Sequence, residues 1–327
     1  MQIKSILAAL GLASMAAISV AQGQPALSRM TIVVGAPPGG SADAAVRIVA
    51  EQLHQDMKTT VLVENRPGAE MLLATQYVSK RPPNGDTLLY LPSGPATVNP
   101  LVYPATAIDV TTGLTPLSMM AMAPLLLLVS KQVPVTNMRE FVDYAKARPG
   151  ELNYASAATT HQVAVEMLMM ATGVKMTAVQ YNGTARSLAA LVANEVQVGV
   201  LDIGSVYEAV KSGGVRALSI ASPERSAVLP DVMTASQAGY PAFDMETWGS
   251  FFGPPGLSAE LTKSLNSALV RAIDNQKVRG QLSVLGFQAA PSSPEQLVER
   301  VKHDRKKFAT VLQYTKDKEN ANRNGAR

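Results

Sequence analysis

Two kinds of hydrophobic spacing alternate along the first part of the chain. Short β-branched runs, typical of buried strands, occupy residues 31–35, 60–63 and 87–91. Between them, apolar residues recur every three or four positions, which places them on one face of a helix. The clearest such series is Ala42, Val46, Val49, Leu53 and Met57. Strands that alternate with helices predict a largely parallel sheet with helices on both of its faces.

The same alternation continues to the end of the chain. Residues 125–129 form a continuous apolar strand, which we interpret as the first crossing into a second domain. Further strands are expected at 151–156, 177–180, 195–201, 217–220 and 248–253. Helices are expected at 70–79, 137–147, 160–172, 184–194, 258–274, 276–285 and from 293 onward. The polar tail from Lys316 is expected to fray.

The order of these elements predicts two lobes. Residues 222–246 have the character of a long surface connection, and the strand after it leads back into the first domain. Lobe one would comprise residues 22–124 plus 249–327, and lobe two residues 125–248. Two crossings of this kind form a hinge with a ligand enclosed between the lobes. The predicted fold class is therefore α/β, with a mostly parallel sheet and flanking helices in each lobe and two crossover strands as the hinge.

The first 21 residues have the features of a secretory signal peptide. Lys4 precedes an apolar stretch over residues 6–20, and Ser19-Val20-Ala21 supplies the small residues that a signal peptidase reads. The alternative is a short membrane anchor, but this stretch falls below the roughly 20 residues that a membrane span needs. We therefore expect cleavage after Ala21 and a periplasmic protein.

Composition and charge narrow the class of protein. The chain is 47% hydrophobic and 17% charged, which is typical of a globular protein and argues against disorder and against a membrane channel. A net charge of +4 is too small to predict nucleic-acid binding, and 5% aromatic residues argue against a base-stacking surface. The sequence has no Cys, which excludes disulfides and thiolate metal sites, and its three scattered His predict no metal cluster. No cofactor is expected.

The candidate chemistry lies in the segments that follow the strands. Ligands of open α/β sheets bind beyond the carboxyl ends of the strands. The segments expected there are 36–43, 92–95, 156–160, 181–184 and 202–205. In the first of them, Pro37-Pro38-Gly39-Gly40 makes an open turn before a helix that begins at Ser41. Backbone N–H groups at a helix start, which carries about +0.5 of a charge, favour anions, so the pattern predicts a binding protein for acids.

Several residues of these segments also have a purely structural interpretation. The Gly39-Gly40 pair could serve only a turn that needs positive φ. Asp43 either complements the helix dipole or touches ligand or water. Asp202 either caps the following helix or lies in the cleft, where its charge would repel an acidic ligand. Thr159-Thr160 could cap a helix and bind a ligand at the same time.

Six short segments within residues 29–313 carry a family resemblance. In chain order they span residues 37–43, 63–69, 83–89, 153–156, 229–232 and 248–256, and they read PPGGSAD, VENRPGA, PNGDTLL, NYAS, LPDV and WGSFFGPPG. Each one is a weak signal, but six in order along one chain are specific. Together they resemble the Bug-type extracytoplasmic solute receptors, the binding components of tripartite tricarboxylate transport systems.

The resemblance implies a type II periplasmic binding protein that closes its two lobes on a small organic carboxylate. It implies further that backbone amides, hydroxyls and bridging waters hold the carboxylate, without an Arg clamp. The positions that match the family's ligand-binding residues are Pro38, Gly39, Gly40, Ser41, Asp43, Ser93 and Gly94 in lobe one, and Ser156, Thr159, Thr160, Tyr181, Gly183 and Asp202 in lobe two.

The chain departs from the family pattern in two places. Ala36 stands where the family usually has an aromatic or similarly large residue, which leaves more room beside the first loop. After Ser156 the family tends to carry a longer Gly-rich loop, whereas here only Ala157-Ala158 precede Thr159-Thr160. The ligand of a relative is therefore not transferred directly to this chain.

An enzyme is not expected, because the sequence has no Gly-x-Ser-x-Gly elbow, no His-Glu-x-x-His and no Cys nucleophile. His161 is interpreted as a packed or solvated side chain and not as a general base. The predicted function is that of a receptor that delivers its carboxylate to the membrane permease subunits of a tripartite tricarboxylate transporter. The alternative is a sensor that presents the carboxylate-bound state to a membrane signalling protein. A monomer without nucleic-acid partners is expected in either case.

Overall fold

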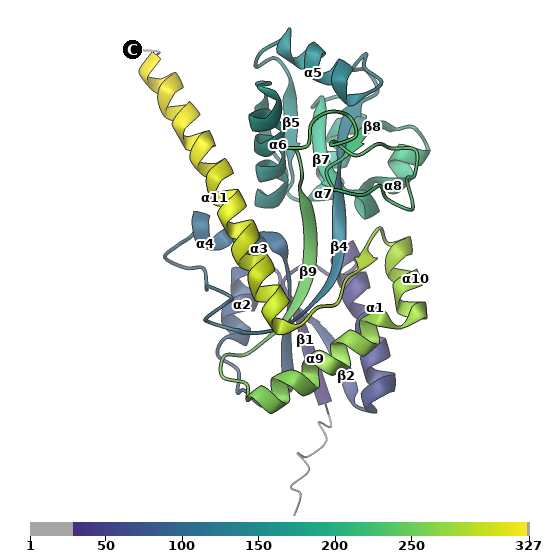
Figure 1. Ribbon diagram of the computed structural model, residues 1–327, viewed down its shortest axis with the longest axis vertical. Coiled ribbons are helices and arrows are strands. Elements are labelled where there is room, and N and C mark those ends of the chain that lie inside the picture. The colour runs from purple at the N-terminus through teal and green to yellow at the C-terminus, as the bar shows by residue number, and fades with distance from the viewer. Residues whose placement is uncertain (1–28, 326–327) are drawn as a thin grey trace, which may run out of the picture.

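The computed structural model describes residues 29–325, with side chains as far as residue 317. Two lobes lie one above the other, and two long strands run between them (Figure 1). The molecule therefore has the predicted two-lobed α/β arrangement. The predicted signal peptide, residues 1–21, lies outside the described residues.

Lobe one contains the parallel strands that the β-branched runs predicted. They are β1 (Arg29–Val34), β2 (Thr60–Asn65) and β3 (Thr87–Pro92). Parallel pairing of β1 with both β2 and β3 gives the order β2-β1-β3. The sheet continues antiparallel through β9 (Glu246–Gly253), β4 (Thr115–Ser130) and the short β10 (Gln288–Ala289). One face is covered by α1 (Ser41–Met57), α9 (Ala259–Asp274) and α10 (Gln276–Val284). The other face carries η1 (Ala69–Met71), α2 (Leu72–Val78) and α3 (Ser93–Thr97), which α4 (Asn99–Val102) follows.

Lobe two repeats this plan with a second set of parallel strands. They are β5 (Asn153–Ser156), β6 (Thr177–Gln180) and β7 (Val198–Asp202), and they pair in the order β7-β5-β6. Antiparallel β4 separates β7 from β8 (Val215–Ile220). Helices α5 (Met138–Lys146) and α6 (Thr159–Thr172) cover one face, and α7 (Thr184–Val192) and α8 (Ile203–Lys211) cover the other.

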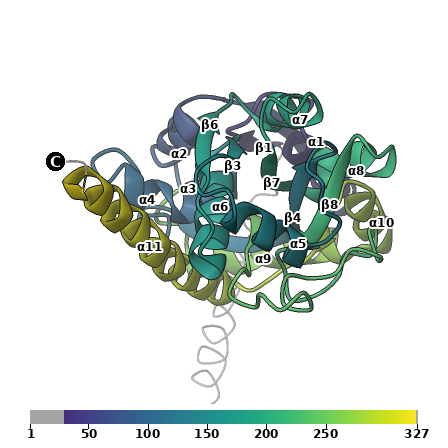
Figure 2. The same cartoon turned by 90° about the horizontal axis from the view of Figure 1, so that it is seen from above.

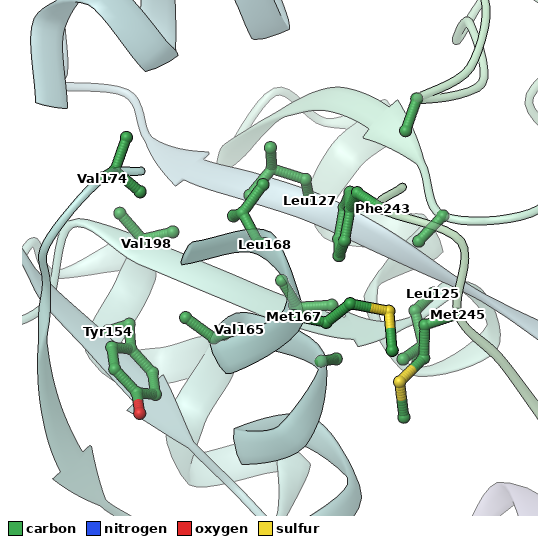
Figure 3. Close-up of a cluster of buried hydrophobic side chains, with 14 of the residues drawn as sticks. Leu125, Leu127, Tyr154, Val165, Met167, Leu168, Val174, Val198, Phe243 and Met245 are labelled. Carbon is green, nitrogen blue, oxygen red and sulfur yellow. The ribbon is translucent and has the colours of Figure 1, made fainter. Parts of the chain in front are cut away.

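The core of lobe two fixes the position of α6. Figure 3 shows Leu127 of β4 and Leu168 of α6 in one cluster with Phe243, which comes from the connection after β8. All three are essentially inaccessible to solvent, and full burial of an apolar side chain of this size contributes roughly 1.5–3 kcal/mol. The apolar face of α6 thus holds the helix on the sheet, and its first residues are held at the interlobe side.

Two antiparallel strands connect the lobes. They are β4 (Thr115–Ser130) and β9 (Glu246–Gly253). Strand β4 pairs with β9 as far as Pro124 and with β7 and β8 from Leu125 onward. The sequence predicted only its second half, because Pro116 and Pro124 interrupt the first half and a proline lacks the donor that a strand ladder needs. The structure accommodates this half with two register shifts against β9.

The last helix, α11 (Pro294–Gly325), packs on both lobes. Leu297 and Val301 lie in a core cluster of lobe one, and Phe308 and Val311 lie in the main core cluster of lobe two. Figure 2 shows α11 running along one side of the molecule. The expected fraying from Lys316 is not found in the backbone, which stays helical to Gly325. No helix within residues 29–325 is both long and apolar enough to cross a membrane.

A second difference from the sequence prediction concerns residues 93–95, which were expected to close the strand at 87–91 as part of a candidate ligand-binding segment, with no helix there. They form the first turn of α3 instead. Pro95 fits there because the first turn of a helix leaves its N–H groups without intrahelical partners, so the missing donor costs no hydrogen bond. The consequence is that Ser93 and Gly94 are held on a helix start.

Candidate functional site

The segments at the carboxyl ends of the parallel strands of the two lobes meet at the interlobe side. Gly94, after β3 in lobe one, lies against Thr160, near the start of α6 in lobe two. A β-carbon built on Gly94 would collide with the Thr160 hydroxyl, so the approach depends on glycine. A second close approach joins Gly204, in the first turn of α8, to the backbone of Leu285 in lobe one. These are two close approaches between the lobes, in addition to the packing of α11 on both.

The helices that begin at this interlobe side share a property that sets them apart from the four helices α5, α9, α10 and α11. Helices α1, α3, α6, α7 and α8 follow β1, β3, β5, β6 and β7, and none of the five has a side-chain cap at its N-terminus. Helices α5, α9, α10 and α11 begin elsewhere, and each is capped by a side chain, from Asn137, Ser258, Asn275 and Ser293. The two other described α-helices, α2 and α4, directly follow η1 and α3, and they also lack a side-chain cap.

This contrast has a direct chemical meaning. A helix leaves its first N–H groups without intrahelical partners, and a capping side chain normally satisfies one of them. Where the cap is missing, those donors are left for water or for a bound anion, which the helix dipole also favours. The interlobe side is thus lined with backbone donors from both lobes.

Asp43 organises the first loop of lobe one. Its Oδ2 accepts from the Gly39 N–H at 3.0 Å and from Arg47 Nε at 2.9 Å. Its Oδ1 accepts from Arg47 Nη2 at 3.1 Å and from Asn65 Nδ2 at 2.8 Å. Burial favours the neutral acid, but these donors outweigh it and lower the pKa of Asp43 from 3.8 to about 2. Since a carboxylate has about four acceptor sites, these four hydrogen bonds saturate Asp43, which thereby holds the loop.

Three buried polar atoms near the contact between Gly94 and Thr160 have no hydrogen-bond partner among the described residues. They are Ser93 Oγ in lobe one and Ser156 Oγ and His161 Nδ1 in lobe two. Their residues are 0%, 1% and 5% exposed. A buried polar atom without a partner costs about 1–3 kcal/mol. These atoms are therefore suited to receive a ligand or bound water.

Asp202 links lobe two to a crossover strand. Its Oδ2 lies 3.0 Å from His161 Nε2, and its Oδ1 lies 3.2 Å from the Thr247 hydroxyl on β9. Burial raises the pKa of Asp202, but the charge and hydrogen bond of His161, with the Thr247 bond, more than offset this and leave the pKa lowered. Asp202 stands at the N-cap of α8 without capping it, so the interpretation as a helix cap is wrong.

The remaining predicted residues occupy different environments. Pro38, Gly39 and Gly40 are exposed, and Gly39 has the positive φ of 87° that the turn interpretation required. Ser41 is half-buried at the first position of α1, and Thr159 holds the same position in α6. Tyr181 packs on a core cluster of lobe two, and its N–H donates to Ser156 O at 2.9 Å. Gly183 also has positive φ and open space around its α-carbon.

Sequence reasoning missed four contributors to this arrangement. Arg47 and Asn65 bind Asp43, Thr247 reaches Asp202, and His161 had been interpreted as a bystander. Only Arg47 left a signal, because a basic residue four positions after an acidic one on a helix pairs with it. The other contacts join residues at least 22 positions apart in the chain.

Two further features bear on what the site could hold. Within residues 29–325, no three His, Asp or Glu side chains come together in a way that could bind a metal ion. A cavity of about 640 Å³ lies beside β10, between residues 222–228 of lobe two and residues 286–290 of lobe one. Its described lining includes Glu246 and Arg225 and none of the predicted site residues.

Comparison with known proteins identifies the family. The family model described as the tripartite tricarboxylate transporter family receptor matches residues 45–316. The chain belongs to this family. The predicted resemblance is confirmed, and so is the prediction that the chain is not an enzyme, because the family consists of solute-binding receptors.

Individual relatives agree with this assignment. The protein BugT of Bordetella pertussis is 28% identical over 87% of this chain and 88% of its own length. Among solved structures, Rpa4515 of R. palustris with adipate has a TM-score of 0.80 at 28% identity, over 87% of this chain and 96% of that one. MatC of Rhodopseudomonas palustris with bound malate has a TM-score of 0.77 at 30% identity, over 87% and 98%. The two-lobed fold of the tripartite tricarboxylate transporter receptors is thus also the fold of this chain.

Proposed function

We propose that this chain is a periplasmic receptor that captures a small organic carboxylate between its lobes and delivers it to a tripartite tricarboxylate-type membrane transporter. One observation carries the proposal. All five helices that begin at the interlobe side lack a side-chain cap, whereas α5, α9, α10 and α11 have one. Anion binding explains this distribution, because an anion supplies the acceptors that the caps would otherwise supply.

The charges around the site are consistent with a weakly held, exchangeable anion. The Arg47 guanidinium, which is the cation next to the first loop, is engaged by Asp43 and Asn65. The ligand carboxylate would therefore depend on N–H groups of α1 and α6 and on the hydroxyls of Ser93 and Ser156. Ionised Asp202 repels an anion, so we place the carboxylate on the side of the site away from Asp202.

We also propose that the hinge follows the predicted lobe boundaries. Strand β4 exchanges β9 for β7 and β8 between Pro124 and Leu125. On the return, Met245 packs in the core of lobe two and Trp248 packs in a core cluster of lobe one. The change of strand partner and the change of core cluster support crossings near residues 124 and 248. The two lobes of the monomer would close about these crossings.

Small dicarboxylates are the first ligands to test. Two relatives of the same fold are described with adipate and with malate, and the shorter loop after Ser156 argues against assuming either one. A thermal-shift and calorimetric screen should include malate, adipate, tricarboxylates and neutral amides of the same length. A ligand at 100 times its Kd adds about 2.7 kcal/mol to the free energy of unfolding. If the acids raise the melting temperature of the folded protein no more than the amides do, carboxylate capture is wrong.

Delivery needs a separate test, because binding alone does not distinguish a transport receptor from a sensor. A strain without this chain should lose uptake of the carboxylate that the purified protein binds, and the gene for this chain should restore it. Normal uptake together with lost induction of the transport genes would contradict delivery and would support the sensor alternative.

A further inference from the structure

Buried His161 has a hydrogen-bond partner at one ring nitrogen and none among the described residues at the other. It is 5% exposed, and its Nε2 lies 3.0 Å from Asp202 Oδ2. Its other ring nitrogen, Nδ1, is buried and has no partner among the described residues. The preceding residue, Thr160, lies against Gly94 of lobe one. His161 therefore lies on the helix turn where the two lobes meet.

The ring chemistry limits what Nδ1 can bind. Asp202 is ionised and can only accept, so Nε2 must carry a proton to make their hydrogen bond. Nδ1 is then a bare acceptor in the neutral ring and a donor in the protonated ring. An anionic ligand oxygen is compatible only with the donor form.

Resting on the function proposed above, we propose that His161 is a specificity-determining residue that takes up a proton as the ligand binds and donates through Nδ1 to a ligand carboxylate. The site then contains one cationic donor, and the hydrogen bond with Asp202 holds the His161 ring in position. Capture of the acid is coupled to protonation of the receptor. Ser93 and Ser156, whose hydroxyls also lack partners, supply neutral donors beside it.

The charged groups described around His161 have partners of their own. On β7, Asp202 is the direct partner. On β3, burial raises the pKa of Tyr90, and the nearby charge of Asp202 raises it further. Glu166, on the same helix as His161, is bonded by Gln162. In α11, which packs along α6, Arg300 pairs with Asp304, Arg305 with Asp109 and Lys307 with Asp244. Helix α3 contains no titratable residue.

Calorimetry of the full-length mature protein tests the coupling. Malate and adipate would be titrated in buffers of different ionisation enthalpy, from about pH 5.5 to about pH 8.5, the range in which an ordinary His changes charge. We expect uptake of up to about one proton per ligand and a fall in affinity as the pH rises. His161→Gln should remove the proton uptake and weaken binding by about tenfold or more at low pH, as expected for loss of a charge-assisted hydrogen bond.

His303→Gln is the matched control, because His303 is an exposed residue of α11; it should keep both the proton uptake and the affinity. Binding without proton uptake, or uptake that persists in His161→Gln, would overturn the role of His161 and leave the receptor function intact. An affinity that rises with pH would also overturn the role of His161, because such a rise would indicate that a ligand hydroxyl donates to the neutral ring. Absence of binding by the wild-type protein to any acid tested would instead contradict the receptor function itself.

Discussion

At the scale of single residues, Asp43 shows how a charged group can hold a loop of a candidate binding site in place. Four donors converge on its two oxygens and tie the Gly39 turn, helix α1 and strand β2 together. The exposed Gly39-Gly40 turn is thereby held in one conformation before any ligand arrives. Preorganisation of this kind lowers the entropy cost of binding.

Replacement of Asp43 by Asn tests this role. Asp43→Asn removes the charge, and its amide N–H donor would lie against a donor of Arg47 or Gly39. The substitution should therefore lower the free energy of unfolding at pH 7 by about 2 kcal/mol or more. It should also weaken carboxylate binding. Urea unfolding and calorimetry measure the two effects. Asp56→Asn, at an exposed position of the same helix, should change neither. An Asp43→Asn protein as stable as the wild type would contradict the role.

The lowered pKa of Asp43 also predicts a pH dependence. A carboxyl group whose folded-state pKa is depressed from 3.8 to about 2 stabilises the folded protein fully above its unfolded pKa. That contribution, about 2 kcal/mol, is lost as the pH falls from about 4 through about 2. Unfolding curves across this window should show a smaller acid-induced loss for Asp43→Asn than for the wild type. Equal losses would show that Asp43 is not the titrating group.

The residue scale is also where sequence reasoning reached its limit. Asp43, Ser93, Ser156 and Asp202 were placed at the interlobe side from strand and helix patterns, which are local. Their partners were not, because contacts such as Asn65 with Asp43 or Thr247 with Asp202 depend on how distant strands align. The fold followed from the spacing of apolar residues, whereas the first half of β4 did not, because its prolines and its register shifts hide the strand pattern.

At the scale of elements, α6 and α5 differ in whether a side chain caps the N-terminus of the helix. Helix α6 begins after Ala158, which has the extended backbone of an N-cap residue but no side chain that could accept a hydrogen bond. Helix α5 begins after Asn137, whose side chain accepts from the Glu140 N–H. Stability alone would favour a polar cap at both positions. The missing cap at α6 is therefore best explained by binding.

This difference predicts opposite results for two cap substitutions. Ala158→Asp should raise the free energy of unfolding by about 0.5–1 kcal/mol and strongly weaken carboxylate binding, because its carboxylate occupies the N–H groups and repels an anion. Asn137→Ala should lower the free energy of unfolding by about 1 kcal/mol and leave the affinity unchanged. Denaturant unfolding and calorimetry on both variants make the comparison. Unchanged affinity in Ala158→Asp would show that α6 takes no part in binding.

At the scale of the whole molecule, glycines allow the lobes to touch. Gly94 meets Thr160, and Gly204 meets the carbonyl of Leu285, and neither approach leaves room for a β-carbon. Helix α11 packs on both lobes and Trp248 of β9 donates to its Asp304 at 2.7 Å, so the lobes and the hinge share one support. Closure is thus expected to be a movement about β4 and β9 that ends at these two contacts.

Blocking one contact should hold the lobes apart. Gly204→Ala places a methyl group against the Leu285 carbonyl and should lower carboxylate affinity by about tenfold or more while helix propensity offsets part of any stability loss. Small-angle scattering should show a larger radius of gyration than that of the ligand-bound wild type. Gly280→Ala is the matched control, because a β-carbon there meets nothing within 4 Å. Wild-type affinity in Gly204→Ala would contradict closure onto this contact.

A crystal structure of the protein with a bound dicarboxylate would show whether the helix starts hold the ligand. We expect a ligand carboxylate between the lobes, with its oxygens about 3 Å from N–H groups in the first turns of α1 and α6. A ligand in the cavity beside β10, near Glu246 and Arg225, would show that capture by the helix starts is wrong. A ligand that lies between the lobes without contact to these helix starts would show the same.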